Sequence, residues 1–271
     1  NPLGISPLLR RTLTEHIDAI TAYPDREYTS LRNAIAGYVQ AEAEHIVGGN
    51  GSTELISLFI QTARPQKALI VGPTYSEYEH EVAIGGGHSE LFCLTEEEKE
   101  FRLDTSSLLE RLSQNADLLI LCNPNNPTSS LIRRGQLREI LDFCKTRDIT
   151  VLIDETYVEF TEEPDEATAI PLAEHYDNLI ILRGISKFFA APGLRLGYAV
   201  CSNRQLLEEI NRHKNPWTIN SLAAIAGEIM FTDQNYISQT RKLIGQERKR
   251  VCSALDKSPY YKVFNAHANF A

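Results

Sequence analysis

The feature that most constrains the fold is a series of short apolar runs, each followed at once by polar residues. Three of these runs cover residues 117–122, 150–153 and 179–182, and stretches with helical spacing lie between them. Short apolar strands that alternate with amphipathic helices predict an α/β protein with a mostly parallel central sheet flanked by helices. Ligands bind outside the carboxyl ends of strands in such sheets, so the polar residues mark a candidate site.

The same patterning predicts most of the remaining elements. Helices are expected at residues 26–42, 52–63, 77–84, 136–146 and 235–255, where apolar residues recur at helical spacing. Further strands are expected at residues 67–71, 89–93, 195–200 and 261–264. A chain of 271 residues with no repeat and no low-complexity linker can form one large domain or two.

The composition argues against several classes of partner. With 27 Lys and Arg against 36 Asp and Glu, the formal charge of −9 disfavours nucleic acid, which binds through basic side chains. No apolar run approaches the length of a membrane span, and we predict no metal site. Five cysteines, an odd number without a CxxC pair, indicate a reducing, cytoplasmic compartment. The chain begins at Asn1 and not at Met, which weakens any argument from the lack of a visible signal peptide.

A lysine and an acid occupy the ends of two consecutive apolar runs. Lys187 follows the run at 179–182, and Asp154 closes the run at 150–153. This pairing suits pyridoxal phosphate (PLP), because the lysine forms a Schiff base with the aldehyde and the acid holds the ring nitrogen protonated. Taken alone, Lys187 is more often a surface lysine, and Asp154 is as often a helix cap. Tyr157 can reach the same pocket, although ordinary packing is the more frequent role of a single tyrosine.

A glycine-rich turn and an arginine offer groups for a phosphate. Gly51, Ser52 and Thr53 open a helix whose free N–H groups suit a phosphate, although a plain capping turn is the more common interpretation. No strong strand precedes this turn. Arg195 is expected within an apolar strand, where a buried guanidinium needs either an anion or an internal acid as its partner.

Two more strand ends offer groups for a ring. Asn126 lies between Pro124 and Pro127, which fix the loop, and the alternative is a rigid turn without a ligand. Tyr75 follows Pro73 and offers a flat face for an aromatic ring, with core packing as the usual alternative.

Four motifs in this order resemble the class I and II aminotransferases of PLP fold type I. They are Gly-Asn-Gly-Ser-Thr-Glu at 49–54, Asn-Pro-Asn-Asn-Pro-Thr at 123–128, Asp-Glu-x-Tyr at 154–157 and Ser-Lys-x-Phe…Gly-Leu-Arg-Leu-Gly-Tyr at 186–198. Their order and spacing agree from about Asn1 to Phe270. Each motif alone is moderately specific, and four together are strong support.

The resemblance implies a role for each matched residue around the cofactor ring. Lys187 matches the lysine that binds the cofactor covalently and then acts as general base. Asp154 matches the acid that pairs with the pyridinium nitrogen. Asn126 and Tyr157 match the residues that hydrogen-bond the phenolic oxygen, and Tyr75 matches the aromatic that stacks on the ring.

The resemblance also implies a phosphate cup, a homodimer and two domains. The residues that match the phosphate cup are Gly51, Ser52, Thr53, Ser186 and Arg195. Tyr23 matches the tyrosine that reaches the phosphate of the partner subunit, and Gly184 replaces a hydroxyl residue of many relatives. An N-terminal arm is expected at residues 1–25 and a large PLP-binding domain at 26–245. A small α/β C-terminal domain is expected to start at 246–271 and to be truncated, with the arginine for the substrate carboxylate beyond.

Two branches of the family fit the sequence. Threonine-phosphate decarboxylases of cobalamin synthesis resemble it in finer details at residues 1–4, 76–78 and 187–193, and histidinol-phosphate aminotransferases share the overall pattern. The resemblance therefore favours a PLP-dependent enzyme acting at Cα of an amino-acid-like, phosphorylated substrate. Threonine-phosphate decarboxylase activity is the preferred prediction, and an aminotransferase of the histidinol-phosphate type is the alternative. Alternatives of other classes are a PLP-binding ligand sensor without catalysis and a nucleotide-binding α/β enzyme, which leaves the lysine and acid pairing unexplained.

Overall fold

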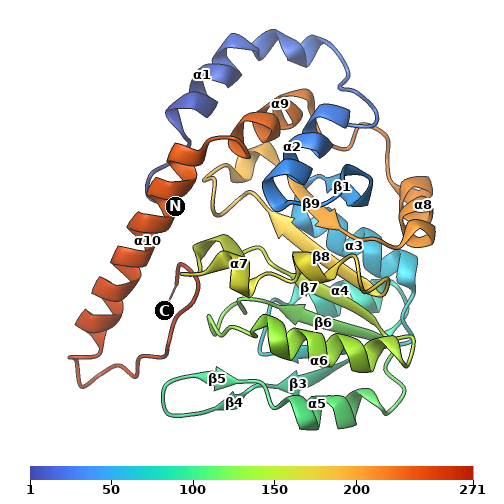
Figure 1. Ribbon diagram of the computed structural model, residues 1–271, viewed down its shortest axis with the longest axis vertical. Helices are drawn as coiled ribbons and strands as arrows, with labels where there is room; N and C mark the ends of the chain where they lie inside the picture. Colours follow the sequence, from blue (N-terminus) through green and yellow to red (C-terminus); the bar gives the residue numbers. More distant parts are fainter. Residues whose placement is uncertain (271) are drawn as a thin grey trace.

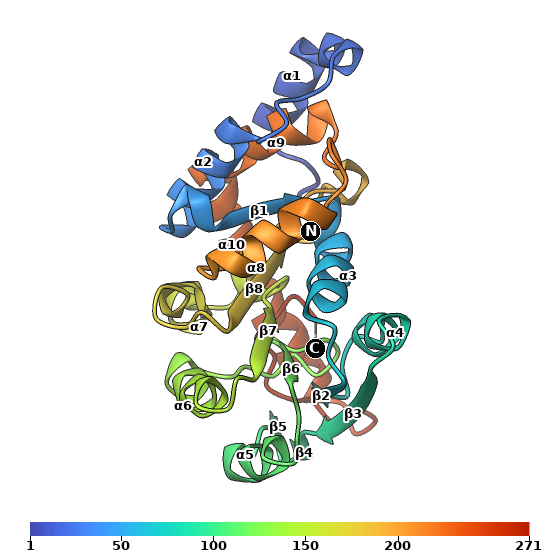
Figure 2. The ribbon, with the colours of Figure 1, turned by 90° about the vertical axis from the view of Figure 1, so that its right-hand side faces the viewer.

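The computed structural model describes residues 1–270 and contains a seven-stranded sheet with helices on both faces (Figures 1 and 2). The strand order is β1-β9-β8-β7-β6-β2-β3. The strands are β1 (Ile46–Gly49), β2 (Lys67–Gly72), β3 (His88–Cys93), β6 (Leu118–Cys122), β7 (Thr150–Asp154), β8 (Leu179–Gly184) and β9 (Gly197–Val200). Strands β3, β2, β6, β7 and β8 pair in parallel, whereas β9 runs antiparallel to both β8 and β1. The prediction of a mostly parallel sheet in an α/β protein is confirmed.

Ten α-helices, five short 3-10 helices and a short hairpin complete the described residues 1–270. The helices are α1 (Pro7–Glu15), α2 (Thr29–Val39), α3 (Gly51–Ala63), α4 (Glu77–Ile84), α5 (Thr105–Leu112), α6 (Arg134–Lys145), α7 (Pro164–Ala167), α8 (Arg204–His213), α9 (Ser221–Met230) and α10 (Gln234–Leu255). The hairpin pairs β4 (Thr95–Glu96) with β5 (Phe101–Arg102). In Figure 2, α3 and α4 lie on one side of the sheet and α6 and α7 lie on the other.

Alternate residues of each buried strand face opposite cores. Leu152 packs with Ile56 of α3 and Val82 of α4, whereas Ile153 packs in the core that includes Leu137 of α6. Because side chains alternate along a strand, residues 154 and 155 also leave the sheet on opposite faces. This alternation places an acid on each side of the sheet at the end of β7.

The structure departs from the expected elements at three places. The prediction of a strand at 261–264 is wrong, because this segment has no strand structure. It meets the hairpin through Phe264, which packs on Phe101, and through Lys262, which pairs with Glu96. The expected strand at 195–200 begins only at Gly197. The glycine-rich turn does follow a strand, β1, which sequence analysis missed because it contains only two apolar residues.

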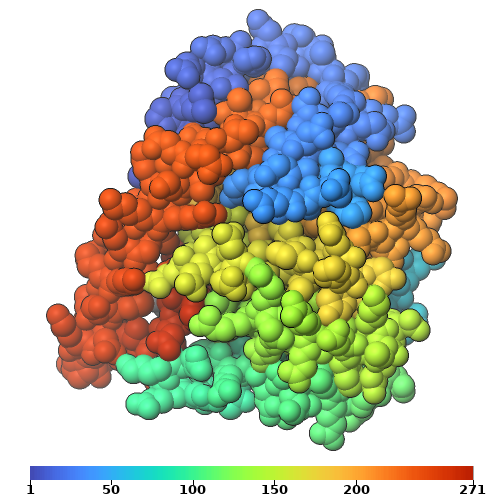
Figure 3. Space-filling view, in the orientation of Figure 1, coloured from blue at the N-terminus to red at the C-terminus, as the bar shows by residue number. Residues whose placement is uncertain are grey.

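Helix α10 and the segment after it form one edge of the molecule (Figure 3). The helix runs without interruption across residue 246, where the domain division was expected, and that division stays a prediction. Residues after α10 fold back to the loop that follows β6 of the large sheet. Arg248 donates hydrogen bonds to the carbonyls of His267 and Ala268, and Ser129 Oγ accepts from both of their N–H groups. These bonds place the ring of Phe270 edge-on against Tyr157, with 4.9 Å between centroids.

Candidate active site

The polar residues predicted from separate strand ends meet at one edge of the sheet. Strands β2, β6, β7 and β8 are parallel neighbours, so their carboxyl ends point the same way. Asp154 at the end of β7 pairs in register with Cys122 of β6 and Leu182 of β8. The loops that carry Tyr75, Asn126 and Lys187 therefore leave the sheet beside Asp154.

Asp154 is a buried carboxylate without a cation among the described residues as its partner. Its side chain is 4% exposed, and its Oδ1 accepts a hydrogen bond of 2.9 Å from the backbone N–H of Thr156. Its Oδ2 accepts one of 2.8 Å from the hydroxyl of Tyr78. Burial raises the pKa of Asp154, and the hydrogen bonds from Thr156 and Tyr78 oppose that shift. A buried carboxylate of this kind fits a ligand that brings a positive charge.

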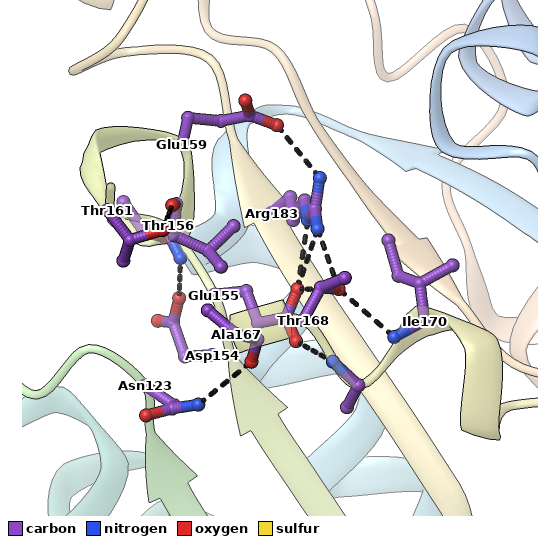
Figure 4. Close-up of polar contacts among 12 residues, drawn as sticks. Asn123, Asp154, Glu155, Thr156, Glu159, Thr161, Ala167, Thr168, Ile170 and Arg183 are labelled. Carbon is purple, nitrogen blue, oxygen red and sulfur yellow. Dashed lines mark hydrogen bonds and ion pairs between the residues drawn. The ribbon is translucent and has the colours of Figure 1, made fainter. Parts of the chain in front are cut away.

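Glu155 leaves β7 on the opposite face and enters a buried ionic network (Figure 4). Its carboxylate accepts hydrogen bonds from Nε and Nη2 of Arg183, at 3.0 and 2.9 Å, and from the hydroxyl of Thr168. Arg183 also pairs with Glu159 at 2.9 Å, which joins β8 to the segment after β7. Because the two acids are consecutive, this network fixes the backbone that carries Asp154.

Lys187 is an exposed residue in a turn whose neighbouring residues Ile185 and Phe188 are buried. The turn follows β8 directly, and the N–H of Phe189 bonds the carbonyl of Ile185 at 3.1 Å. Ile185 and Phe188 are each 1% exposed, whereas Lys187 is exposed. The turn therefore holds Lys187 just beyond the carboxyl end of β8 with its side chain exposed, and Ser186 beside it is half-buried.

The first turn of α3, here called the cradle, presents backbone N–H groups of the kind that bind a phosphate. Asn50 makes no side-chain cap for this helix, and Glu54 accepts a hydrogen bond of 2.6 Å from the N–H of Asn50 instead. Gly51 has φ of +79°, and a Cβ at this position would collide with the guanidinium of Arg195. A Cβ at Gly197 would meet Ser52 N at 2.5 Å. Glycine at both positions lets the N–H groups of the helix start stay open, as an anion site requires.

The expectation that Arg195 is a buried strand residue is wrong. Arg195 precedes β9, its backbone is left-handed with φ of 57°, and its side chain is exposed. The guanidinium donates to the carbonyls of Pro192 at 3.3 Å and Asn50 at 3.4 Å. It therefore lies against the start of α3, where its remaining N–H groups can face an anion without an internal acid.

Tyr75 lies between Asp154 and the start of α3, where Arg195 is found. Its side chain is 38% exposed, and its ring meets that of Tyr78 edge-on with 5.6 Å between centroids. Burial raises the pKa of Tyr75, the charge of Asp154 adds to this shift, and Arg195 opposes it. Tyr157 has a pKa raised by burial first, then by Cys122, Asp154 and Tyr75. These mutual effects show that the predicted aromatic residues and the acid share one environment.

Two predicted site residues, Asn126 and Tyr23, lie in segments whose neighbouring residues make the contacts with the site. Asn126 is half-buried in the loop after β6, where Asn125 Nδ2 donates to the carbonyl of Pro73 at 2.9 Å and joins two loops of the site. Tyr23 on the arm is 79% exposed, and its ring packs on Trp217 with 4.7 Å between centroids. The loop of Trp217 reaches the cup, because Asn50 Nδ2 donates to the carbonyl of Thr218 at 3.2 Å.

Sequence analysis missed Tyr78 and Phe270 as parts of the site. Tyr78 had one available signal, since it lies in the first turn of the helix that follows β2 and shares a helical face with Val82. Phe270 had none, because only the fold brings it to Tyr157. Within residues 1–270, no group of three or more His, Cys, Asp or Glu could hold a metal, and no helix is long and apolar enough to cross a membrane.

Replacing Gly197 by Ala is expected to weaken the binding of phosphate-bearing ligands. The new methyl group would press on backbone atoms, Ser52 N at 2.5 Å and Gly51 C at 2.6 Å, and would displace the first turn of α3. Overpacking of this kind costs about 1–3 kcal/mol. The measurement is the PLP dissociation constant beside the melting temperature. Gly193→Ala is the matched control, since a Cβ at Gly193 meets nothing within 4 Å, and equal affinity for PLP in both variants would contradict the assignment of the cradle.

The comparisons with known proteins agree with this architecture. The family model for aminotransferase class I and II matches residues 9–271. Histidinol-phosphate aminotransferase from Clostridium acetobutylicum superposes with a TM-score of 0.91 at 33% identity, covering 99% of this chain and 78% of that one. The fold is that of the type I PLP enzymes. The chain belongs to the class I and II aminotransferase family, and it is a PLP-dependent decarboxylase or transaminase.

The curated relatives fall into two groups. A putative threonine-phosphate decarboxylase of Caldanaerobacter subterraneus is 37% identical over 100% of this chain and 72% of its own length. The threonine-phosphate decarboxylase of Salmonella typhimurium is 36% identical over 100% of this chain and 73% of its own length. The histidinol-phosphate aminotransferase of Clostridium kluyveri is 35% identical over 92% of this chain and 68% of its own length. Membership of this family implies PLP as the cofactor.

Proposed function

We propose that this protein binds PLP and decarboxylates a phosphorylated amino acid of the threonine-phosphate type. The observation that carries the proposal is the pair of decarboxylases that match 100% of the chain at 37% and 36% identity. The site supports it, because a cradle for one phosphate, a buried acid without a cation and an exposed lysine meet at one sheet edge.

The residues present fit PLP, and each would act on a separate part of it. When bound, the cofactor supplies an electron sink for the charge that develops at the substrate Cα. Lys187 would hold the cofactor covalently and, once released, would move a proton at Cα. Asp154 would keep the ring nitrogen charged, because an opposite charge favours the protonated form. Tyr75 would stack on the ring, and Asn126 and Tyr157 would orient its phenolic oxygen.

The remaining predicted residues would hold the phosphate. Gly51, Ser52 and Thr53 offer backbone N–H groups at the start of α3, and Arg195 and Ser186 flank them. Gly184 stands where many relatives have a hydroxyl residue. A Cβ at Gly184 would meet Ser52 Oγ at 3.2 Å, so the glycine lets Ser52 approach the strand end closely.

The second candidate is an aminotransferase of the histidinol-phosphate type. Its support is the structure from Clostridium acetobutylicum, with a TM-score of 0.91 at 33% identity. The cofactor residues serve either reaction, since the bond at Cα that lies perpendicular to the ring is the one that breaks. The contacts that orient the substrate therefore decide between the two.

The experiment that separates the two candidates supplies PLP-loaded protein with L-threonine phosphate and no keto-acid acceptor. Sustained release of carbon dioxide is expected, and the Lys187→Ala variant serves as the negative control. A transaminase cannot turn over without an acceptor. Bleaching of the visible absorbance by histidinol phosphate, without carbon dioxide release from threonine phosphate, would support the aminotransferase instead.

We further propose that the protein acts as a cytoplasmic homodimer in cobalamin synthesis. Tyr23 and Trp217 form an exposed aromatic pair beside the cup, 79% and 41% exposed, which suits a partner subunit. All five cysteines are free thiols, as expected in a reducing compartment. Sedimentation velocity tests the dimer, and a monomer at all concentrations would exclude a site shared between subunits.

A further inference from the structure

The hydroxyl of Tyr78 donates a hydrogen bond to the carboxylate of Asp154, and the side chain of Thr156 also stabilises that carboxylate. Tyr78 comes from the first turn of α4, which lies on the same face of the sheet as Leu152, so its ring meets the carboxylate from that side. The ring is 0% exposed, and the Oη–Oδ2 distance is 2.8 Å. The second donor, the N–H of Thr156, belongs to the backbone. Tyr78 is therefore a contact with Asp154 from another helix that a change of one side chain removes while the backbone contact of Thr156 stays.

The surroundings of Asp154 keep this hydroxyl a donor. The titratable groups that face Asp154 are the hydroxyls of Tyr75, Tyr78 and Tyr157 and the thiol of Cys122. Burial raises the pKa of Tyr78 well above its ordinary value and that of Cys122 to about 12. All four groups are therefore neutral near pH 7, and Tyr78 donates a proton that it does not lose.

We propose that Tyr78 is a positioning residue that holds Asp154 as a carboxylate aimed at a cationic ring nitrogen. A hydrogen bond to the charged form favours that form, so Tyr78 lowers the proton affinity of Asp154. With PLP bound, Asp154 would then stay a charged carboxylate and would favour the protonated ring nitrogen. This inference rests on the proposed function, since it concerns the same site with PLP bound.

The test is Tyr78→Phe, which removes one oxygen and conserves the packed ring. With PLP loaded, the midpoint of the pH titration of the visible absorbance should move up by about one unit. A positive ring nitrogen would repel a second proton from the nitrogen that joins Lys187 to the cofactor. If the ring nitrogen carries less charge, that second nitrogen would keep its proton to a higher pH. The kcat should fall about tenfold or more, because a hydrogen bond to a charged group is lost, with KM changed less than about threefold.

The matched control is Tyr176→Phe. Tyr176 Oη also donates to a carboxylate, Asp142 Oδ1, at 2.6 Å, but it precedes β8 and so lies at the opposite edge of the sheet. Its substitution should leave the titration midpoint and kcat unchanged. The double variant Tyr78→Phe with Asp154→Asn should show no further midpoint shift beyond Asp154→Asn alone, since the two side chains act through one contact.

A readout on the apoprotein separates this inference from the proposed function. Without PLP, Tyr78→Phe should lower the melting temperature more at pH 8 than at pH 5, because an ionised carboxylate loses a donor. Wild-type protein that never develops visible absorbance with PLP would overturn the proposed function. Normal absorbance with an unchanged midpoint in Tyr78→Phe, or an equal shift in the Asp154→Asn background, would overturn the role of Tyr78 alone.

Discussion

Replacing Lys187 by Ala should abolish the visible absorbance of the PLP-loaded protein and reduce kcat by at least about 10⁴-fold. The variant loses both the covalent attachment and the amine that moves a proton at Cα. The fold should be unaffected, because Lys187 is exposed while its neighbours Ile185 and Phe188 anchor the turn. Absorbance after addition of PLP, followed by single-turnover kinetics, measures both effects.

A second lysine provides the control for this experiment. Lys145 lies at the end of α6, shortly before β7 begins, and therefore at the edge of the sheet opposite to the site. Lys145→Ala should keep the absorbance and the activity. Unchanged absorbance in Lys187→Ala would show that another lysine binds the cofactor, and the assignment would then fail.

Replacing Asp154 by Asn is expected to act in opposite directions on activity and on the stability of the apoprotein. Activity should fall by about 10²–10³-fold, the usual effect of removing one preorganised electrostatic contact. The apoprotein should become more stable at neutral pH, because the variant no longer buries a carboxylate without a cation. The amide fits the same space, with Oδ1 accepting from Thr156 N–H and Nδ2 donating to Tyr78 Oη.

The sign of the pH dependence follows from the raised pKa of Asp154. Folded protein binds a proton at Asp154 more readily than unfolded protein, whose carboxyl titrates near 3.8. The stabilisation by that proton is fully present below the unfolded pKa and is lost as pH rises through the folded pKa. The stability difference between Asp154→Asn and wild type should therefore grow with pH, which melting curves of the apoproteins from pH 4 to pH 8 can measure.

Addition of PLP should reverse this order of stability. The ring nitrogen brings the positive charge that Asp154 lacks, so saturating PLP should raise the melting temperature of wild type more than that of Asp154→Asn. Each kcal/mol shifts the melting temperature of a domain of 150–250 residues by roughly 2–4 °C. An equal rise in the melting temperature of both proteins on addition of PLP would remove Asp154 from the pyridinium role.

The elements of the central sheet are predictable from sequence because their signals are local. Helix α4 matches the expected range 77–84 at both ends, and the strands at 150–153 and 179–182 differ from β7 and β8 only at their ends. Long apolar runs bounded by glycine, proline or polar residues leave few alternatives for a buried parallel sheet. The same locality predicted that the acid and the lysine share one edge.

The remaining features depend on contacts between distant segments. Strand β1 is too short to be read from two apolar residues and forms by pairing with β9, far along the chain. Arg195 lies between apolar residues that suggest a strand, but its left-handed backbone closes a turn before β9. Tyr78 is visible as a buried helical residue, although helical spacing does not say which strand end lies opposite. For these reasons the acid was predictable, and its hydrogen-bond partner was not.

Asp154 and Glu155 are consecutive carboxylates that differ in whether a cation neutralises them, and this difference affects ligand selectivity. Glu155 is neutralised by Arg183 within the protein, whereas Asp154 has no such cation among the described residues. A ring that carries a basic nitrogen compensates this charge, and a carbocyclic analogue of the same shape leaves it buried and uncompensated. We therefore expect the site to discriminate between flat aldehydes by their basicity, which shape complementarity alone cannot do.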